Sequence, residues 1–208
     1  MSSAKKDCEE FMKLNRLWLA VVPATLLFAQ APNNDAGWLS LFDGKTLTGW
    51  HSEGDAAWKV AGDTISAGMT GDGWLRSGKE YGNFLLQVEF RNSPKGNSGV
   101  FLRSGKDSNV KEKCNPQTAY ELQINNEEPN WPTGSIEDVI HPLVKANPAP
   151  NEWHRYVVEL RGDHIVAHLD GKKVLDGHDS KLKAGFIGLQ HHKDSPVAFR
   201  AIRIKPLP

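Results

Sequence analysis

The chain has 208 residues, 39% of them hydrophobic and 24% charged, with 25 basic and 25 acidic side chains. This balanced charge gives no reason to expect nucleic acid or an anionic membrane as a partner, and the hydrophobic content excludes a disordered chain. Seven Trp and 19 Gly favour an all-β domain with many turns.

The N-terminus has the pattern of a secretory signal peptide. A short basic region, residues 13–16, precedes twelve apolar residues and the small-x-small sequence Ala29-Gln30-Ala31. The apolar run is shorter than the about 20 residues of a transmembrane helix, so a retained membrane anchor is the less favoured alternative. We expect a leader over residues 1–31, with Met12 as the alternative initiator, and an exported mature chain in the periplasm or outside the cell. Cys114 would then be unpaired in the mature chain, without an internal disulfide.

The mature chain, residues 37–208, is expected to form one domain of about a dozen short strands and no helix. Asp43-Gly44 and Asp170-Gly171 are turn signals between such strands. Evenly spaced short strands are typical of a two-sheet antiparallel β-sandwich or jelly roll. In chain order the strands are predicted at residues 38–42, 47–51, 58–60, 64–67, 73–77, 84–91, 97–103, 120–124, 153–160, 164–169, 173–175, 185–190 and 197–205.

Two segments of this chain have a distinctive character. In the strand 84–91, Phe84, Leu86, Val88 and Phe90 alternate with more polar positions, so these four are expected to point inward. Residues 125–151 contain five Pro and no strand pattern. A loop of that length in a compact domain is usually functional or a lid.

Motifs along the whole mature chain identify it with a known family. They are, in order, Leu41-Phe42-Asp43-Gly44-Lys45-Thr46-Leu47-Thr48-Gly49-Trp50, Tyr81-Gly82-Asn83-Phe84, Gly96-Asn97-Ser98-Gly99-Val100-Phe101-Leu102-Arg103, Tyr120-Glu121-Leu122-Gln123-Ile124 and Gly188-Leu189-Gln190-His191-His192. This series resembles the family once called DUF1080, now named for 3-keto-disaccharide hydrolase activity. The resemblance implies a concanavalin A-like jelly roll. One departure is Gly134-Ser135-Ile136-Glu137, where members often have Gly-Ala-Ile-Tyr.

The strand 120–124 is the centre of the predicted site. Tyr120, Leu122 and Ile124 would share one face, and Glu121 and Gln123 the other, about 7 Å apart along the strand. The polar pair is either a solvated outer face or part of a concave sugar-binding site, and the resemblance favours the site. Glu121 would then be a general base, and Gln123 would hold a sugar hydroxyl.

The neighbouring strand is expected to add Asn97 and Arg103 to the same site. The guanidinium of Arg103 offers several donors in one plane, which suits sugar oxygens or a developing enolate. The alternative is an ion pair between Arg103 and Glu121 across the sheet.

A third strand is expected to present Gln190 and His192 beside Gly188, whose missing side chain leaves room for a ligand. His192 titrates near neutral pH and is the natural proton-transfer partner for Glu121, or else a surface histidine. Trp74 and Trp131 could stack on a pyranose ring. The chain has no zinc pattern, calcium loop, phosphate-binding loop or nucleophile elbow, so no metal and no cofactor are expected.

These residues predict a particular reaction on a small carbohydrate. Ordinary glycosidases need two carboxylates, and here Gln123 follows where a second would stand. One base is enough for elimination from a 3-keto-glycoside followed by hydration, with Glu121, Arg103 and His192 as base, enolate stabiliser and acid. The alternatives are a non-catalytic carbohydrate-binding module of the same fold and a structural or interaction domain on the cell surface.

Overall fold

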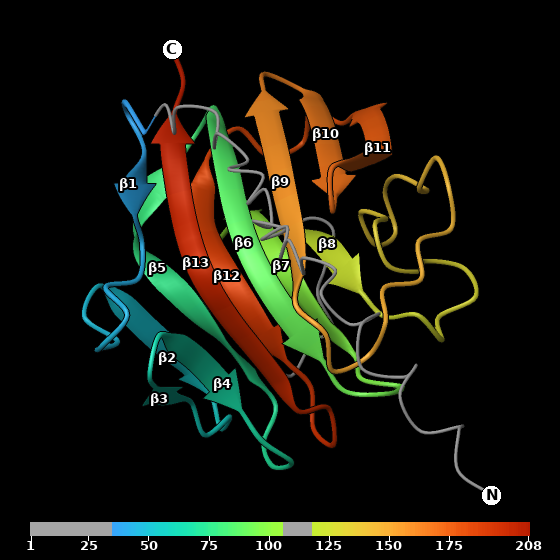
Figure 1. Cartoon of the computed structure of the whole chain (residues 1–208). Helices are drawn as coiled ribbons and strands as arrows, with labels where there is room; N and C mark the ends of the chain where they lie inside the picture. The colour runs from blue at the N-terminus through green and yellow to red at the C-terminus, as the bar shows by residue number, and fades with distance from the viewer. Residues whose placement is uncertain (1–34, 106–117) are drawn as a thin grey trace, which may run out of the picture. The chain divides into compact units, whose positions relative to one another are not determined.

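The computed structural model describes residues 35–105 and 118–208, and the predicted leader and Cys114 lie outside them. The described residues form thirteen β-strands and no helix, arranged in two antiparallel sheets (Figure 1). The expectation of an all-β, two-sheet fold is therefore confirmed. None of these residues belongs to a helix long and apolar enough to cross a membrane.

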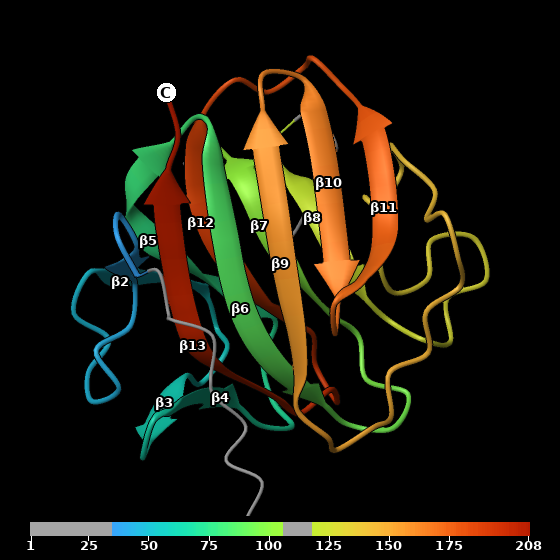
Figure 2. The ribbon, with the colours of Figure 1, turned by 45° about the horizontal axis from the view of Figure 1, so that its top comes forward.

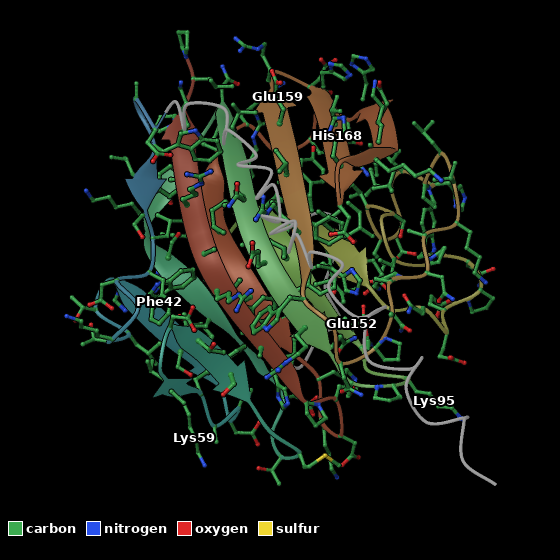
Figure 3. All side chains as sticks on the ribbon, in the orientation of Figure 1. Phe42, Lys59, Lys95, Glu152, Glu159 and His168 are labelled. Carbon is green, nitrogen blue, oxygen red and sulfur yellow. The ribbon has the colours of Figure 1, made fainter. Side chains whose placement is uncertain are left out.

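The larger sheet has eight strands. In spatial order they are β11 (Lys172–His178), β10 (His164–Leu169), β9 (His154–Arg161), β6 (Phe84–Asn92), β13 (Val197–Pro206), β4 (Thr64–Ala67) and β3 (Lys59–Ala61), and β1 (Leu39–Ser40) also pairs with β13. The outer side of this sheet faces away from the core, and Glu159 on β9 and His168 on β10 belong to it (Figure 3).

The smaller sheet has five strands, and it carries the predicted site. Their spatial order is β2 (Trp50–Gly54), β5 (Gly73–Tyr81), β12 (Gly185–His191), β7 (Ser98–Ser104) and β8 (Tyr120–Ile124). Figure 2 shows β7, β8 and β12 behind the strands of the larger sheet, so the two sheets form the two layers of a sandwich.

The core lies between the two sheets. From the larger sheet, Phe84, Leu86, Val88 and Phe90 of β6 are at most 1% exposed, as their alternation predicts. The smaller sheet contributes Tyr120, Leu122 and Ile124 of β8 to the same apolar cluster. Period-two alternation thus fixes which face of each strand is buried in the core.

The long segment 125–151 is attached to the edge of β8. Leu122 pairs with Ile136 as an antiparallel bridge. The amide of Gln123 donates to the carbonyl of Ser135, and the amide of Glu137 donates to the carbonyl of Glu121, both at 3.0 Å. Figure 1 shows this loop beside β8. Its first half therefore extends the smaller sheet instead of forming a detached lid.

Candidate functional site

The side of the smaller sheet that faces away from the core carries two rows of side chains. The pairing of Leu189 with Val100 places Gln190 beside Gly99, and this joins the strands into continuous rows. We call this surface the outer face. The first row is Glu53, Trp74, Gln190, Gly99 and Gln123, and the second is His51, Arg76, Gly188, Phe101 and Glu121.

Glu121 and Gln123 share the outer face, but that face of β8 is not solvated. Glu121 is 1% exposed and Gln123 is 2% exposed, so β8 is buried on both sides. The side chain of Glu121 lies over Gly99, where a Cβ atom would be 2.7 Å from Glu121 Cγ. Gln123 Oε1 accepts a hydrogen bond of 3.0 Å from the amide of Ile124. The outer face therefore holds a buried carboxylate in a space that Gly99 leaves for it.

Trp74 and Gln190 are direct cross-strand partners on the outer face. Trp74 is 2% exposed and packs edge-to-face on Phe101 with ring centroids 5.3 Å apart. Trp74 Nε1, Gln190 Oε1 and Asn97 Oδ1 are buried without a hydrogen-bond partner. Each such atom costs about 1–3 kcal/mol unless something bonds to it. A donor and an acceptor side by side suit a ligand with hydroxyl groups.

The space at Gly188 is taken by this chain. A Cβ atom there would be 2.6 Å from Trp74 Cε3 and 3.0 Å from Phe101 Cδ2. Gly188 therefore admits the two aromatic rings, and the prediction that it leaves room for a ligand is wrong. Gly99, which precedes Phe101 by two residues in β7, instead leaves the space that the Glu121 carboxylate occupies.

Arg103 does not join the outer face. Its φ of 50° is left-handed, which breaks the alternation of β7 at this residue. The guanidinium donates to the carbonyls of Gly82, Gly162 and Leu182 at 2.9, 2.7 and 2.8 Å. Burial lowers the pKa of Arg103 from its ordinary value. The expectation that Arg103 lies beside Glu121, as enolate stabiliser or as ion-pair partner, is therefore wrong.

Arg76 is the arginine that the structure describes on the outer face, and it is not among the site residues predicted from the sequence. Its Nε lies 2.9 Å from Glu53 Oε1, and its Cζ lies 4.6 Å from the centroid of the Phe186 ring. The signal was present, because Arg76 follows Trp74 by two residues in one strand. Two strands, β12 and β7, separate it from Glu121 on β8.

His192 and Trp131 lie outside the two rows. His192 follows the last residue of β12, and its half-exposed ring has Nδ1 3.6 Å from Asp72 Oδ1. The neighbouring His191 is 1% exposed, with Nε2 2.7 Å from the carbonyl oxygen of Gly68. Trp131 lies in the 125–151 loop and stacks on His141 at 4.0 Å, so one face of its indole is already covered. The structure therefore does not bring either residue next to Glu121 through any described contact.

The described parts of the chain do not bring together the side chains that bind a metal ion. Residues 35–105 and 118–208 contain no group of three or more His, Cys, Asp or Glu side chains arranged to hold one.

Solved structures share this fold. One is a protein from Parabacteroides distasonis ATCC 8503, provisionally named a glycosyl hydrolase, which is 26% identical with a TM-score of 0.67, covering 82% of this chain and 99% of the other. Another is the carbohydrate-binding module CBM66 from Bacillus subtilis, 17% identical with a TM-score of 0.61, covering 79% and 99%. The class that the fold defines is therefore the lectin-like jelly rolls.

The family can be stated more narrowly. The sequence pattern of the 3-keto-alpha-glucoside-1,2-lyase-like domain matches residues 37–205, and the chain belongs to this family. A curated relative is the 3-keto-disaccharide hydrolase of Bacteroides thetaiotaomicron strain VPI-5482, which is 26% identical over 86% of this chain and 81% of the relative. The family predicted from the motifs is confirmed.

Proposed function

We propose that this protein is a carbohydrate-active enzyme that cleaves 3-keto-glycosides, among them 3-keto-disaccharides, by elimination followed by hydration. Membership of the 3-keto-alpha-glucoside-1,2-lyase-like family supports this reaction, as does the name of the B. thetaiotaomicron relative. The observation that carries the proposal is the buried carboxylate of Glu121 on the same sheet face as the unpartnered Trp74 Nε1 and Gln190 Oε1.

The reaction needs one base near C2 of the sugar. The ketone at C3 acidifies the C2 proton, which Glu121 removes, and the electron pair left behind forms an enolate. The enolate re-forms the ketone, the C1–C2 double bond is made, and the C1–O bond to the aglycone breaks. The departing oxygen takes a proton. Water then adds its hydroxyl to C1 and a proton to C2, which completes a net hydrolysis.

The unpartnered polar atoms would hold the sugar against this base. Gln190 Oε1 accepts a hydrogen bond from a sugar hydroxyl, and Trp74 Nε1 donates one to a sugar oxygen, including the enolate oxygen. Neighbouring strands of a sheet lie about 4.8 Å apart, so β5, which carries Trp74, is about 10 Å from β7, over which the Glu121 carboxylate lies. A pyranose ring with its hydroxyl groups spans such a gap. Arg103 is left out of this assignment because its guanidinium caps three carbonyls elsewhere.

A carbohydrate-binding module of the same fold is the second candidate. The unpartnered donor and acceptor on the outer face would serve a binder equally well. A binder has no use for a base in the Gly99 space, so the carboxylate of Glu121 distinguishes the two candidates.

The test follows the C2 proton. The protein is incubated with 4-nitrophenyl 3-keto-β-glucoside in D₂O, nitrophenol release is measured, and the 3-keto-glucose product is examined for deuterium at C2. Elimination and hydration place one solvent deuteron there, whereas direct hydrolysis places none. Authentic 3-keto-glucose in D₂O corrects for spontaneous exchange, and 4-nitrophenyl β-glucoside, which lacks the ketone, is the substrate control.

The base assignment is tested in the same assay with Glu121→Gln. Removing a general base is expected to lower kcat by about 10²–10⁴-fold while binding is kept. Binding without turnover by the wild-type protein would replace the enzyme with the binding module. Equal cleavage of the ketone-free glucoside would rule out elimination.

A further inference from the structure

The edge of β8 brings a second carboxylate to the proposed site. The bridge between Leu122 and Ile136 sets the register of the loop against β8. The hydrogen bonds on either side of this bridge, from the amide of Gln123 to Ser135 and from the amide of Glu137 to Glu121, continue the same register. Glu137 therefore stands opposite Glu121, sixteen residues later in the chain.

The side chain of Glu137 is not part of the core. Ile136 is 0% exposed and packs in the core cluster with Leu122, its bridge partner. Glu137 follows Ile136 and opens the turn of residues 137–139, and its side chain is partly exposed where that of Ile136 is buried. Directly opposed residues have Cβ atoms about 4.5–5.5 Å apart.

The backbone of Glu137 lies on the other side of β8 from the space that the Glu121 carboxylate occupies. Glu121 leans over Gly99 toward β7, which is the direction away from the loop that carries Glu137. Glu137 is partly exposed, whereas Glu121 is buried. The unpartnered Nε1 of Trp74, a residue 2% exposed on β5, belongs to the outer face and indicates a ligand on that face, with β12 and β7 between Trp74 and β8.

We propose that Glu137 is the proton donor to the departing oxygen. This inference rests on the proposed elimination and gives it the acid that the reaction needs. The Glu137 carboxylic acid gives its proton to the aglycone oxygen as the C1–O bond breaks, and the electron pair of that bond leaves with the oxygen. In the hydration step the Glu137 carboxylate takes a proton from water as the hydroxyl adds to C1. Glu121, whose proton exchanges with solvent after the aglycone has left, gives a solvent-derived proton to C2. Both carboxyl groups end as they began.

This role was predicted for His192. Its ring lies past the end of β12 beside Asp72, and two strand pairings, β12 with β7 and β7 with β8, separate it from Glu121. Glu137 is hydrogen-bonded through its backbone to Glu121 itself. The described geometry therefore favours Glu137 as the acid.

The experiment compares two leaving groups in order to distinguish the role of Glu137 from the role of Glu121. Nitrophenolate leaves without a proton at neutral pH, whereas the methoxide of methyl 3-keto-β-glucoside needs one. Glu137→Gln is expected to lower the single-turnover rate of aglycone release from the methyl substrate by about 10²-fold or more and from the nitrophenyl substrate by less than about 3-fold. Single-turnover rates are compared because the later hydration step is common to both substrates. Glu121→Gln is expected to lower both, because C2 deprotonation precedes departure of either group.

Glu127→Gln is the matched control, since Glu127 is an exposed glutamate of the same loop whose amide bonds to Asn125 Oδ1 at 3.1 Å. This control is expected to match the wild type on both substrates, and thermal melting of each variant monitors folding. Equal losses on both substrates in Glu137→Gln, or no loss on either, would overturn the inference while leaving the elimination in place. No turnover of either 3-keto substrate by the wild type would overturn both proposals.

Discussion

Replacement of Arg103 by Met tests whether this residue is structural or catalytic. The side chain of Arg103 is 1% exposed, and its guanidinium ties together three chain segments through the carbonyls of Gly82, Gly162 and Leu182. A fourth, longer bond of 3.4 Å reaches Asn83 Oδ1. Met fills a similar volume without a donor, so the variant isolates the hydrogen bonds from the packing.

The magnitude follows from the three short bonds. Hydrogen bonds to a charged group contribute about 1.5–3 kcal/mol each, which would total about 5–9 kcal/mol for three. Burying the charged guanidinium costs several kcal/mol of desolvation, which is absent in the Met variant, and this offsets part of the hydrogen-bond contribution. We expect Arg103→Met to lower the free energy of unfolding by about 3–5 kcal/mol, against a usual total of about 5–15 kcal/mol.

Urea unfolding followed by tryptophan fluorescence measures this loss. Arg103→Lys keeps the charge but offers a single donating atom, so it is expected to recover only part of the stability. The folded fraction of Arg103→Met should retain kcat on the 3-keto substrates within about 3-fold, since its guanidinium does not lie on the outer face. A variant with wild-type stability and a kcat about 100-fold lower would refute this reasoning and return Arg103 to the catalytic site.

Two further predictions concern β7 and β8. Gly99→Ala places a methyl group against Glu121 Cγ. We expect the free energy of unfolding to fall by about 1–3 kcal/mol and kcat to fall on both 3-keto substrates. Unchanged kinetics would show that the Glu121 carboxylate can shift without loss of function. Burial and the hydrogen bond to Asp179 raise the pKa of Tyr120 to about 12. The pKa of a tyrosine in the unfolded chain is about 10. The stabilisation linked to the raised pKa of Tyr120 is therefore fully present below pH 10 and is lost as the pH rises toward 12, by about 2–3 kcal/mol in all. The stability advantage of wild type over Tyr120→Phe should therefore shrink between pH 8 and pH 11 in urea unfolding, and a constant advantage would contradict the raised pKa.

Local alternation was enough to predict most of the fold. The bounds of β8 and β10 coincide with the predicted ranges 120–124 and 164–169, because each is a short alternating run ended by a polar residue or turn. The strand predicted at 73–77 instead extends to Tyr81 as β5. That strand continues because β2 and β12 both pair with it, and pairing partners distant in sequence leave no local pattern.

The site was harder to predict because its residues depend on geometry beyond one strand. Alternation correctly placed Glu121 and Gln123 on one face, but it carried no information on how deeply that face is buried. Arg103 was placed wrongly because a single left-handed residue reverses the direction of a side chain. Arginine at a positive φ has no sequence signature comparable to that of Gly, so this error could not be avoided from the pattern alone.

The prediction that the site has a single carboxylate also rests on the pattern of one strand, residues 120–124. Gln123 in place of an acid predicts that Glu121 is the single carboxylate of its strand, yet a sheet face is shared by neighbouring strands as well as by alternate residues. The edge segment of the loop supplies Glu137 opposite Glu121 through two backbone hydrogen bonds and one bridge. Family members often have Tyr where this chain has Glu137, and a phenol, like a carboxylic acid, carries a proton that it can donate. If Glu137 and Glu121 have the proposed roles of acid and base, a change at this one position would alter the acidity of the donor while the base and the sheet register stay the same, and the preferred leaving group would change with it.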